Sequence, residues 1–153
     1  MANENGVPES VNGVTYPVVN THNEWDPLEE IIVGIVDGAL IPPWDGIMEA
    51  TLHKQALWDF HKQHGGTPWP QEFLQAAQKN LDEFVHFLEA EGVTVRRPTP
   101  TDFSKPYSTP DFQIDSGCYA LMPRDVLLVI GDQIIEAPMG WRSRYHENHA
   151  YKD

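Results

Sequence analysis

The chain has 153 residues, and its 23 acidic side chains against 10 basic ones give a net charge of −13. This excess of carboxylates argues against nucleic acid and anionic membranes as partners, because both are bound by clustered lysine and arginine. A cationic small molecule is favoured instead. The single cysteine excludes an intrachain disulfide and is typical of a reducing compartment.

No stretch of the sequence approaches the roughly 18 continuous apolar residues of a membrane span. The opening MANENGVPES lacks the basic and apolar regions of a signal peptide. We therefore expect a cytoplasmic chain with no membrane contact. Residues 1–17 are polar and interrupted by Gly6, Pro8 and Gly13, which predicts a mobile tail. Residues 18–153 have a length that fits one domain.

The first regular element expected is a strand rich in β-branched residues. Its apolar members are Ile31, Ile32, Val33, Ile35 and Val36. Apolar side chains on both faces indicate a buried strand. The following residues 40–46 (LIPPWDG) predict a loop, because two consecutive prolines continue neither a strand nor a helix.

Two helices are expected next. Residues 48–64 contain good helix formers and end at Gly65-Gly66, which stops a helix. Residues 71–91 carry the clearest helical pattern, with apolar residues at steps of three and four, and Gly92 ends it. The core-facing stripe is predicted to consist of Leu74, Ala77, Leu81, Phe84 and Leu88.

The rest of the chain predicts mainly strands. Residues 93–97 (VTVRR) alternate as a half-buried strand. Residues 126–130 and 134–137 flank Gly131-Asp132, a two-residue turn that closes a β-hairpin. Residues 141–153 are expected to start another helix. This order of elements predicts an α/β or α+β domain with helices packed on a small sheet.

Histidines and the cysteine are the first candidates for chemistry. Two histidine pairs lie three residues apart, His61 with His64 and His146 with His149. Neither belongs to a ligand set typical of zinc, so no metal is predicted and solvent-facing helix histidines are preferred. Cys118 is a candidate nucleophile, but no nearby histidine would lower the thiol pKa. A buried structural cysteine is favoured.

Asp111 follows Thr109-Pro110 on a short loop whose backbone the proline restricts. The residues alone leave two interpretations open. The first is a structural role as an Asx turn or a helix N-cap. The second is a binding role, in which the carboxylate accepts paired hydrogen bonds from a planar cation such as a guanidinium.

Two groups of charged and aromatic residues follow this region in the sequence. Arg124 and Asp125 are expected to form an ion pair that supports the loop, although a solvated pair contributes little. Trp141, Arg142 and Arg144 form a basic, aromatic patch on an acidic chain. Pairing of these arginines with the chain's own carboxylates is favoured over ligand binding.

Five blocks carry a more specific pattern. They are NEWDPLEEIIVG (23–34), EGVTVRRP (91–98), TPDF (109–112), MPRD (122–125) and IIEAPMGWRSRY (134–145). In this order they resemble the N-terminal part of the glycine amidinotransferase family. The resemblance implies transfer of the amidino group of L-arginine to an acceptor amine such as glycine. The reaction passes through an amidino-cysteine and needs no metal or organic cofactor.

The same resemblance implies a fold and an assembly. Family members consist of ββαβ-type modules arranged as a pseudo-fivefold α/β propeller, and many are dimers. Residues 18–153 are then expected to form a partial, incomplete domain of this kind. By the match of TPDF, the resemblance implies that Asp111 is the aspartate that contacts the substrate guanidinium.

The departures from the family decide the expected activity. Family enzymes are more than twice this length, and their nucleophilic cysteine and general-base histidine lie in the part absent here. Cys118 is not at the family's cysteine position. We therefore expect a truncated homologue that has no catalytic residues of its own and is inactive alone. The alternatives are a non-catalytic arginine-binding or homo-oligomeric assembly module and, less favoured, a guanidine hydrolase that uses Cys118.

Overall fold

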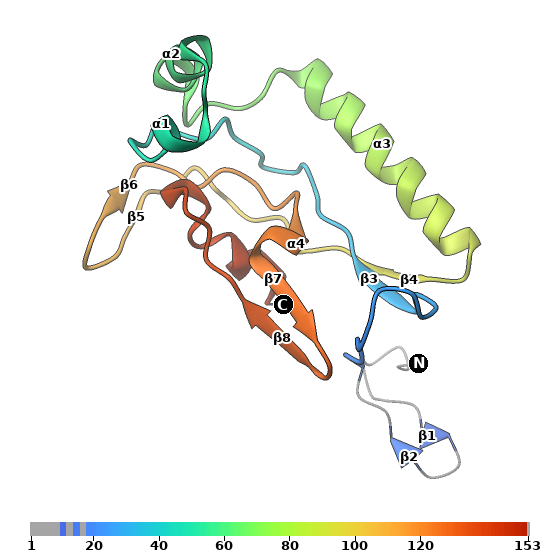
Figure 1. Ribbon diagram of the computed structural model, residues 1–153. Helices are drawn as coiled ribbons and strands as arrows, with labels where there is room; N and C mark the ends of the chain where they lie inside the picture. The colour runs from blue at the N-terminus through green and yellow to red at the C-terminus, as the bar shows by residue number, and fades with distance from the viewer. Residues whose placement is uncertain (1–9, 12–13, 16–17, 153) are drawn as a thin grey trace.

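The computed structural model describes residues 10–11, 14–15 and 18–152 (Figure 1). In the predicted N-terminal tail, β1 (Ser10–Val11) and β2 (Val14–Thr15) pair as antiparallel strands. The other residues of that predicted tail lie outside the described part of the chain. Among the described residues, no helix is long and apolar enough to cross a membrane.

A βαβ unit forms the first packed layer. The strands β3 (Glu30–Ile32) and β4 (Thr94–Arg96) are parallel. Parallel neighbours need a long crossover, which here contains α3 (Gln71–Ala90). Figure 1 shows this helix running along one side of the molecule towards β4. The core beneath it consists of Val33, Leu88 and Val93, with Ile31, Leu81, Val85 and Val95 packed against them.

The observed core-facing stripe of α3 matches the predicted one only in part, because Leu74 and Ala77 are half-buried and lie outside this core cluster. Leu81 and Leu88 face the core as expected, but Val85 contacts it in place of Phe84, which is exposed. Steps of 81 to 84 and 81 to 85 both satisfy helical periodicity, so the pattern alone does not choose between them. Gly92 ends the helix at a φ of 85°, as predicted.

The single helix predicted over residues 48–64 is two helices, α1 (Met48–Thr51) and α2 (Gln55–His64). Residues 52–54 separate them, and Leu52 is extended, with φ −105° and ψ 111°. The indole N–H of Trp58 donates to the Leu52 carbonyl at 2.6 Å. A side chain therefore takes the carbonyl that a continuous helix would have used for its own backbone bond.

The described strands form four separate two-stranded pairs. The prediction of one small sheet on which the helices pack is therefore wrong. The third pair is β5 (Tyr107–Ser108) with β6 (Gln113–Ile114), and the fourth is β7 (Leu127–Ile130) with β8 (Gln133–Glu136). The predicted hairpin β7–β8 is confirmed, and Gly131 takes a φ of 59° in its turn. Residue 126 belongs instead to α4 (Pro123–Val126). Within the described part of the chain, isolated bridges such as Ile35 with Ala120 are the only further strand-like pairings, so the ladders do not merge.

A second core joins the loop after β3 to the C-terminal half of the chain. It consists of Ile35, Leu40, Phe103, Ala120 and Ala150, with Tyr151 packed against them. The N–H of Ile35 donates to the carbonyl of Ala120 at 2.8 Å. Beside this bond, a Cβ on Gly34 would stand 2.1 Å from the carbonyl oxygen of Leu121. Only glycine permits this approach of the two backbones.

The C-terminal stretch forms two short 3₁₀ helices, η1 (Arg142–Arg144) and η2 (Glu147–Tyr151), where one further helix was predicted. Bonds to distant parts of the chain fix their geometry. The indole N–H of Trp141 donates to the hydroxyl of Thr51, 90 positions earlier, at 2.9 Å. This contact ties η1 to α1.

Candidate functional site

Asp111 lies exposed at the tip of the β5–β6 hairpin. Thr109 holds the turn, because its Oγ1 accepts the N–H groups of Asp111 and Phe112, both at 3.2 Å. The turn is therefore capped by a threonine and not by an Asx interaction of Asp111. Among the described residues, the Asp111 carboxylate forms no ion pair. The turn thus presents an open carboxylate to solvent.

Aromatic rings surround the base of this turn. The ring of Phe112 meets that of Tyr145 edge to face at 5.3 Å, and Tyr107 lies 4.7 Å from His146. Burial, together with the nearby charges of His149 and Lys152, lowers the pKa of His146. The imidazole is therefore biased towards its neutral form, in which it packs with its aromatic neighbours.

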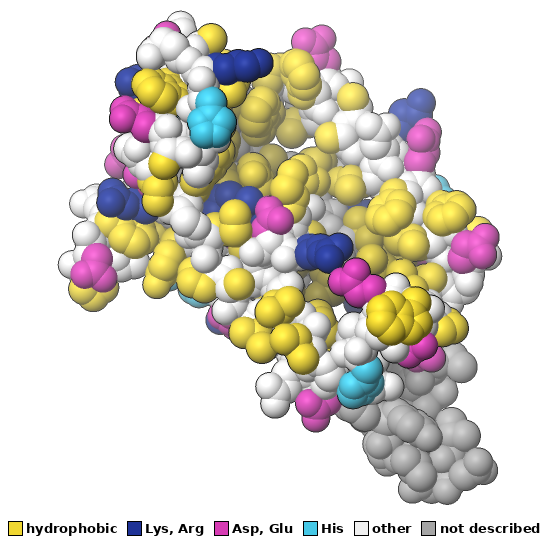
Figure 2. Space-filling model, in the orientation of Figure 1, with side chains coloured by type: hydrophobic (Ala, Val, Ile, Leu, Met, Phe, Trp, Pro, Cys, Tyr) yellow, Lys and Arg dark blue, Asp and Glu magenta, His cyan; other side chains and the backbone are white. Residues whose placement is uncertain are grey.

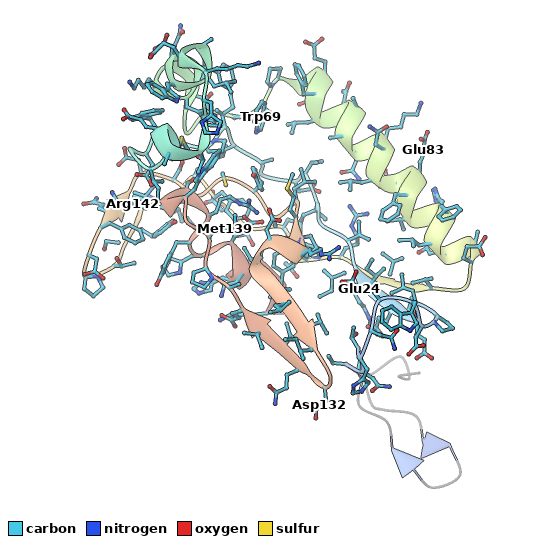
Figure 3. The ribbon with its side chains drawn as sticks, viewed as in Figure 1. Glu24, Trp69, Glu83, Asp132, Met139 and Arg142 are labelled. Carbon is cyan, nitrogen blue, oxygen red and sulfur yellow. The ribbon has the colours of Figure 1, made fainter. Side chains whose placement is uncertain are left out.

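Asp45 is a buried carboxylate on the loop before α1. Its Oδ2 accepts the backbone N–H of Arg142 at 3.1 Å, and its Oδ1 lies 3.7 Å from Nη1 of that arginine. The Arg142 guanidinium also lies over the Phe112 ring, with Cζ 5.3 Å from the centroid. Figure 3 labels Arg142 between the β5–β6 hairpin and α1.

The expected ion pair between Arg124 and Asp125 does not form. Arg124 reaches Glu24, with Nη2 3.2 Å from Oε1, and Asp125 instead accepts a bond from Arg144 at 2.8 Å. Both residues lie in the single turn of α4, where adjacent side chains do not face each other. The pair of Arg124 with Glu24 is solvent-exposed, so it adds little stability.

Arg144 is the centre of a buried ion cluster. Its Nε and Nη2 donate to the two carboxylate oxygens of Glu147, the second at 3.0 Å, and its Nη1 donates to Asp125. Burial opposes the charged form, but these hydrogen bonds raise the pKa of Arg144, so the guanidinium stays charged. The favoured pairing of the basic patch with the chain's own carboxylates is therefore confirmed. This cluster holds α4 against η2.

Cys118 is buried, as expected, with 1% of its surface exposed. Burial, reinforced by the charge of Glu147, raises the pKa of its thiol to about 12. Nucleophilic cysteines need the opposite shift, since the thiolate is the attacking species. Cys118 is therefore a packing residue in this structure.

The histidines are only partly as predicted. His61 is buried, where a solvent-facing side chain was expected, and its Nδ1 lies 2.9 Å from the carbonyl oxygen of Pro42. That bond fixes α2 to the proline loop. Within the described residues, no group of three or more histidine, cysteine, aspartate or glutamate side chains is placed to hold a metal ion.

The sequence of the chain was compared with those of known proteins. No protein-family model matches the chain. It is 54% identical over 138 residues to the L-arginine:L-lysine amidinotransferase of Pseudomonas savastanoi pv. phaseolicola, covering 90% of this chain and 37% of that protein. It is 49% identical over 134 residues to the mitochondrial glycine amidinotransferase of Danio rerio, covering 88% and 31%. The chain belongs to the amidinotransferase family.

Solved amidinotransferases have the same fold over the matched part. The amidinotransferase SxtG of Microseira wollei superposes with a TM-score of 0.76 at 51% identity, covering 88% of this chain and 37% of that one. The inosamine-phosphate amidinotransferase StrB1 of Streptomyces griseus gives 0.75 at 40% identity, covering 90% and 39%. The chain spans about a third of the length of the curated relatives it matches.

Membership in the amidinotransferase family leaves two expectations open. The cytoplasmic location stays a prediction, because the Danio rerio relative is named a mitochondrial enzyme. The guanidinium-binding role of Asp111 also stays a prediction. Sequence reasoning missed Asp45 altogether, since 97 residues separate it from Arg142 and no local pattern links them.

Proposed function

We propose that this chain supplies one wall of the L-arginine site of an amidinotransferase, with Asp111 as the carboxylate that binds the substrate guanidinium. The observation that carries the proposal is the open carboxylate at the tip of a turn that Thr109 holds. In the proposed reaction, the amidino group of L-arginine passes to an acceptor amine such as glycine. No metal or organic cofactor takes part.

The chemistry of Asp111 suits a guanidinium. A carboxylate accepts two parallel N–H bonds from this planar cation, which fixes orientation as well as position. A turn held by three hydrogen bonds places the carboxylate in advance, so less entropy is lost when the substrate binds. The net charge of −13 adds a long-range attraction for a cationic substrate.

We propose further that the chain alone transfers no amidino group. The single cysteine is Cys118, and its burial leaves no thiolate for an amidino-cysteine intermediate. The parallel unit of β3, α3 and β4, followed by hairpins, is consistent with one ββαβ-type module of an α/β propeller. In this proposal, residues outside this chain provide the nucleophile and the general base.

Calorimetric titration with L-arginine tests the role of Asp111. We expect Asp111→Asn to weaken binding by about tenfold to a hundredfold, because a charge-assisted hydrogen bond contributes about 1.5–3 kcal/mol. L-citrulline has nearly the same shape without the positive charge, so it should bind no more tightly to the native chain than to the variant. We expect no ornithine in a mixture of the native chain with L-arginine and glycine.

Asp132→Asn is the matched control, since it removes an equally exposed carboxylate at the turn of the other hairpin. It should leave the arginine affinity unchanged. Equal heats for the native chain and Asp111→Asn, or no heat with either, would refute arginine binding at Asp111. Ornithine release would refute the proposed inactivity.

A second candidate function is self-assembly, and the β7–β8 hairpin favours it. Five apolar side chains of this hairpin are exposed, on both of its faces: Leu128, Val129, Ile130, Ile134 and Ile135. Figure 2 shows apolar atoms gathered over this part of the molecule. An isolated two-stranded pair is only marginally stable, and an open apolar edge is a template for pairing. A second copy of the chain could cover this surface.

Sedimentation velocity at increasing protein concentration tests this assembly. We expect the native chain to form dimers and Ile135→Lys to remain monomeric, because the substitution places a charge in the apolar pair of Leu128 and Ile135. Gln133→Lys adds the same charge on the same strand without removing an apolar side chain, and it should still associate. A native chain that stays monomeric throughout would exclude this candidate.

A further inference from the structure

Arg142 contacts two segments that lie far from it in the sequence, the β5–β6 hairpin and the loop before α1. Its carbonyl accepts the hydroxyl of Tyr107 in β5, and its guanidinium lies over Phe112 in the turn. Its backbone N–H and its side chain both engage Asp45, on the loop before α1. The two ends of the Asp111 hairpin are therefore braced through one arginine.

The Arg142 side chain itself ends in a guanidinium, and it lies beside the proposed site for the substrate guanidinium at Asp111. Its side chain is 52% exposed, and the ring beneath it belongs to Phe112, the residue next to Asp111. An arginine side chain that was free to turn would compete with substrate for the Asp111 carboxylate, since both are planar cations of the same chemistry. An open Asp111 therefore requires a contact that holds this cation away from the Asp111 carboxylate.

Asp45 is placed to hold it. Its side chain is 3% exposed, and the backbone N–H of Arg142 fixes one of its oxygens while the other faces the guanidinium. The N–H of Ile47 also approaches this second oxygen, at 3.4 Å, so Asp45 is tied to its own loop as well. A buried carboxylate in this setting is a fixed counter-charge and does not follow the arginine into solvent.

We propose that Asp45 is a positioning residue for Asp111. It keeps Arg142 on Phe112, so that the hairpin stays braced and the Asp111 carboxylate stays open to an incoming guanidinium. The bracing of the hairpin concerns the structure of this chain alone. The opening of the carboxylate to substrate rests on the proposed function, in which Asp111 binds L-arginine.

The structural part is tested by NMR of the Arg142 side-chain Nε–Hε signal. In the native background, Asp111→Asn should leave this signal unchanged. In the Asp45→Asn background, Asp111→Asn should shift it, because the released guanidinium then contacts Asp111. If Asp111→Asn leaves the Arg142 Nε–Hε signal unchanged in both backgrounds, the inference is overturned, whether or not the chain binds arginine.

The functional part is tested by calorimetry with L-arginine. We expect Asp45→Asn to weaken binding about tenfold, which corresponds to Arg142 occupying Asp111 in about nine-tenths of the molecules. Removing the competitor as well, in Asp45→Asn with Arg142→Gln, should restore most of the affinity. A purely structural role for Asp45 predicts no such rescue, so a double variant as weak as Asp45→Asn would refute the competition. If the native chain binds no arginine, the proposed function fails and the NMR result still decides the structural part.

Discussion

Glu147→Gln is expected to lower the free energy of unfolding by about 3–5 kcal/mol, because it leaves the buried Arg144 guanidinium without its bidentate partner. Arg144 and Glu147 are 5% and 2% exposed, so water does not replace the lost carboxylate. Asp125 remains, but it contributes a single bond. Small domains are stable by only about 5–15 kcal/mol, so a urea titration should show the loss clearly.

A double substitution separates the cost of an unpaired charge from the value of the pair. Replacing both partners, by Arg144→Met with Glu147→Leu, removes the buried charge together with its counter-ion. Such apolar replacements are often neutral or stabilising, so the double variant should recover most of the loss of Glu147→Gln. A single variant within about 1 kcal/mol of the native chain would show that the pair is not buried in solution.

Native Cys118 is expected to react with iodoacetamide about a thousandfold more slowly than free cysteine near neutral pH. Burial raises its pKa from 9.0 to about 12, and each pH unit reduces the thiolate tenfold. The sign of the shift also fixes the pH dependence. The rate for free cysteine levels off above about pH 9, whereas the rate for native Cys118 continues to rise towards pH 12.

The labelling experiment has internal controls, because the chain has one cysteine. In denaturing urea, Cys118 should react at the rate of free cysteine. A chain with Cys118→Ala and Ser108→Cys carries one thiol at an exposed position of β5, and it should react quickly when native. Labelling of native Cys118 within about tenfold of free cysteine would contradict its burial and reopen the guanidine-hydrolase hypothesis.

Local patterns predicted the elements whose geometry depends on neighbouring residues. The helix α3 and the β7–β8 hairpin follow from apolar spacing and from the conformational freedom of Gly92 and Gly131. The break at Leu52 escaped prediction, because it depends on a bond from the Trp58 indole that the helical pattern does not encode. The predicted single sheet failed for a similar reason, since strand order is set by pairing across long loops.

The sequence by itself determined the family, through five ordered blocks, and it singled out Asp111 and the favoured burial of Cys118. Only the tertiary structure decided what surrounds them. It placed Asp45 against Arg142 across 97 residues, gave Arg124 and Asp125 separate partners, and buried Glu147 beneath Arg144. The physical reason is that hydrogen bonds and ion pairs depend on distance in space. Residue type and spacing predict only the contacts between residues that are close in the sequence.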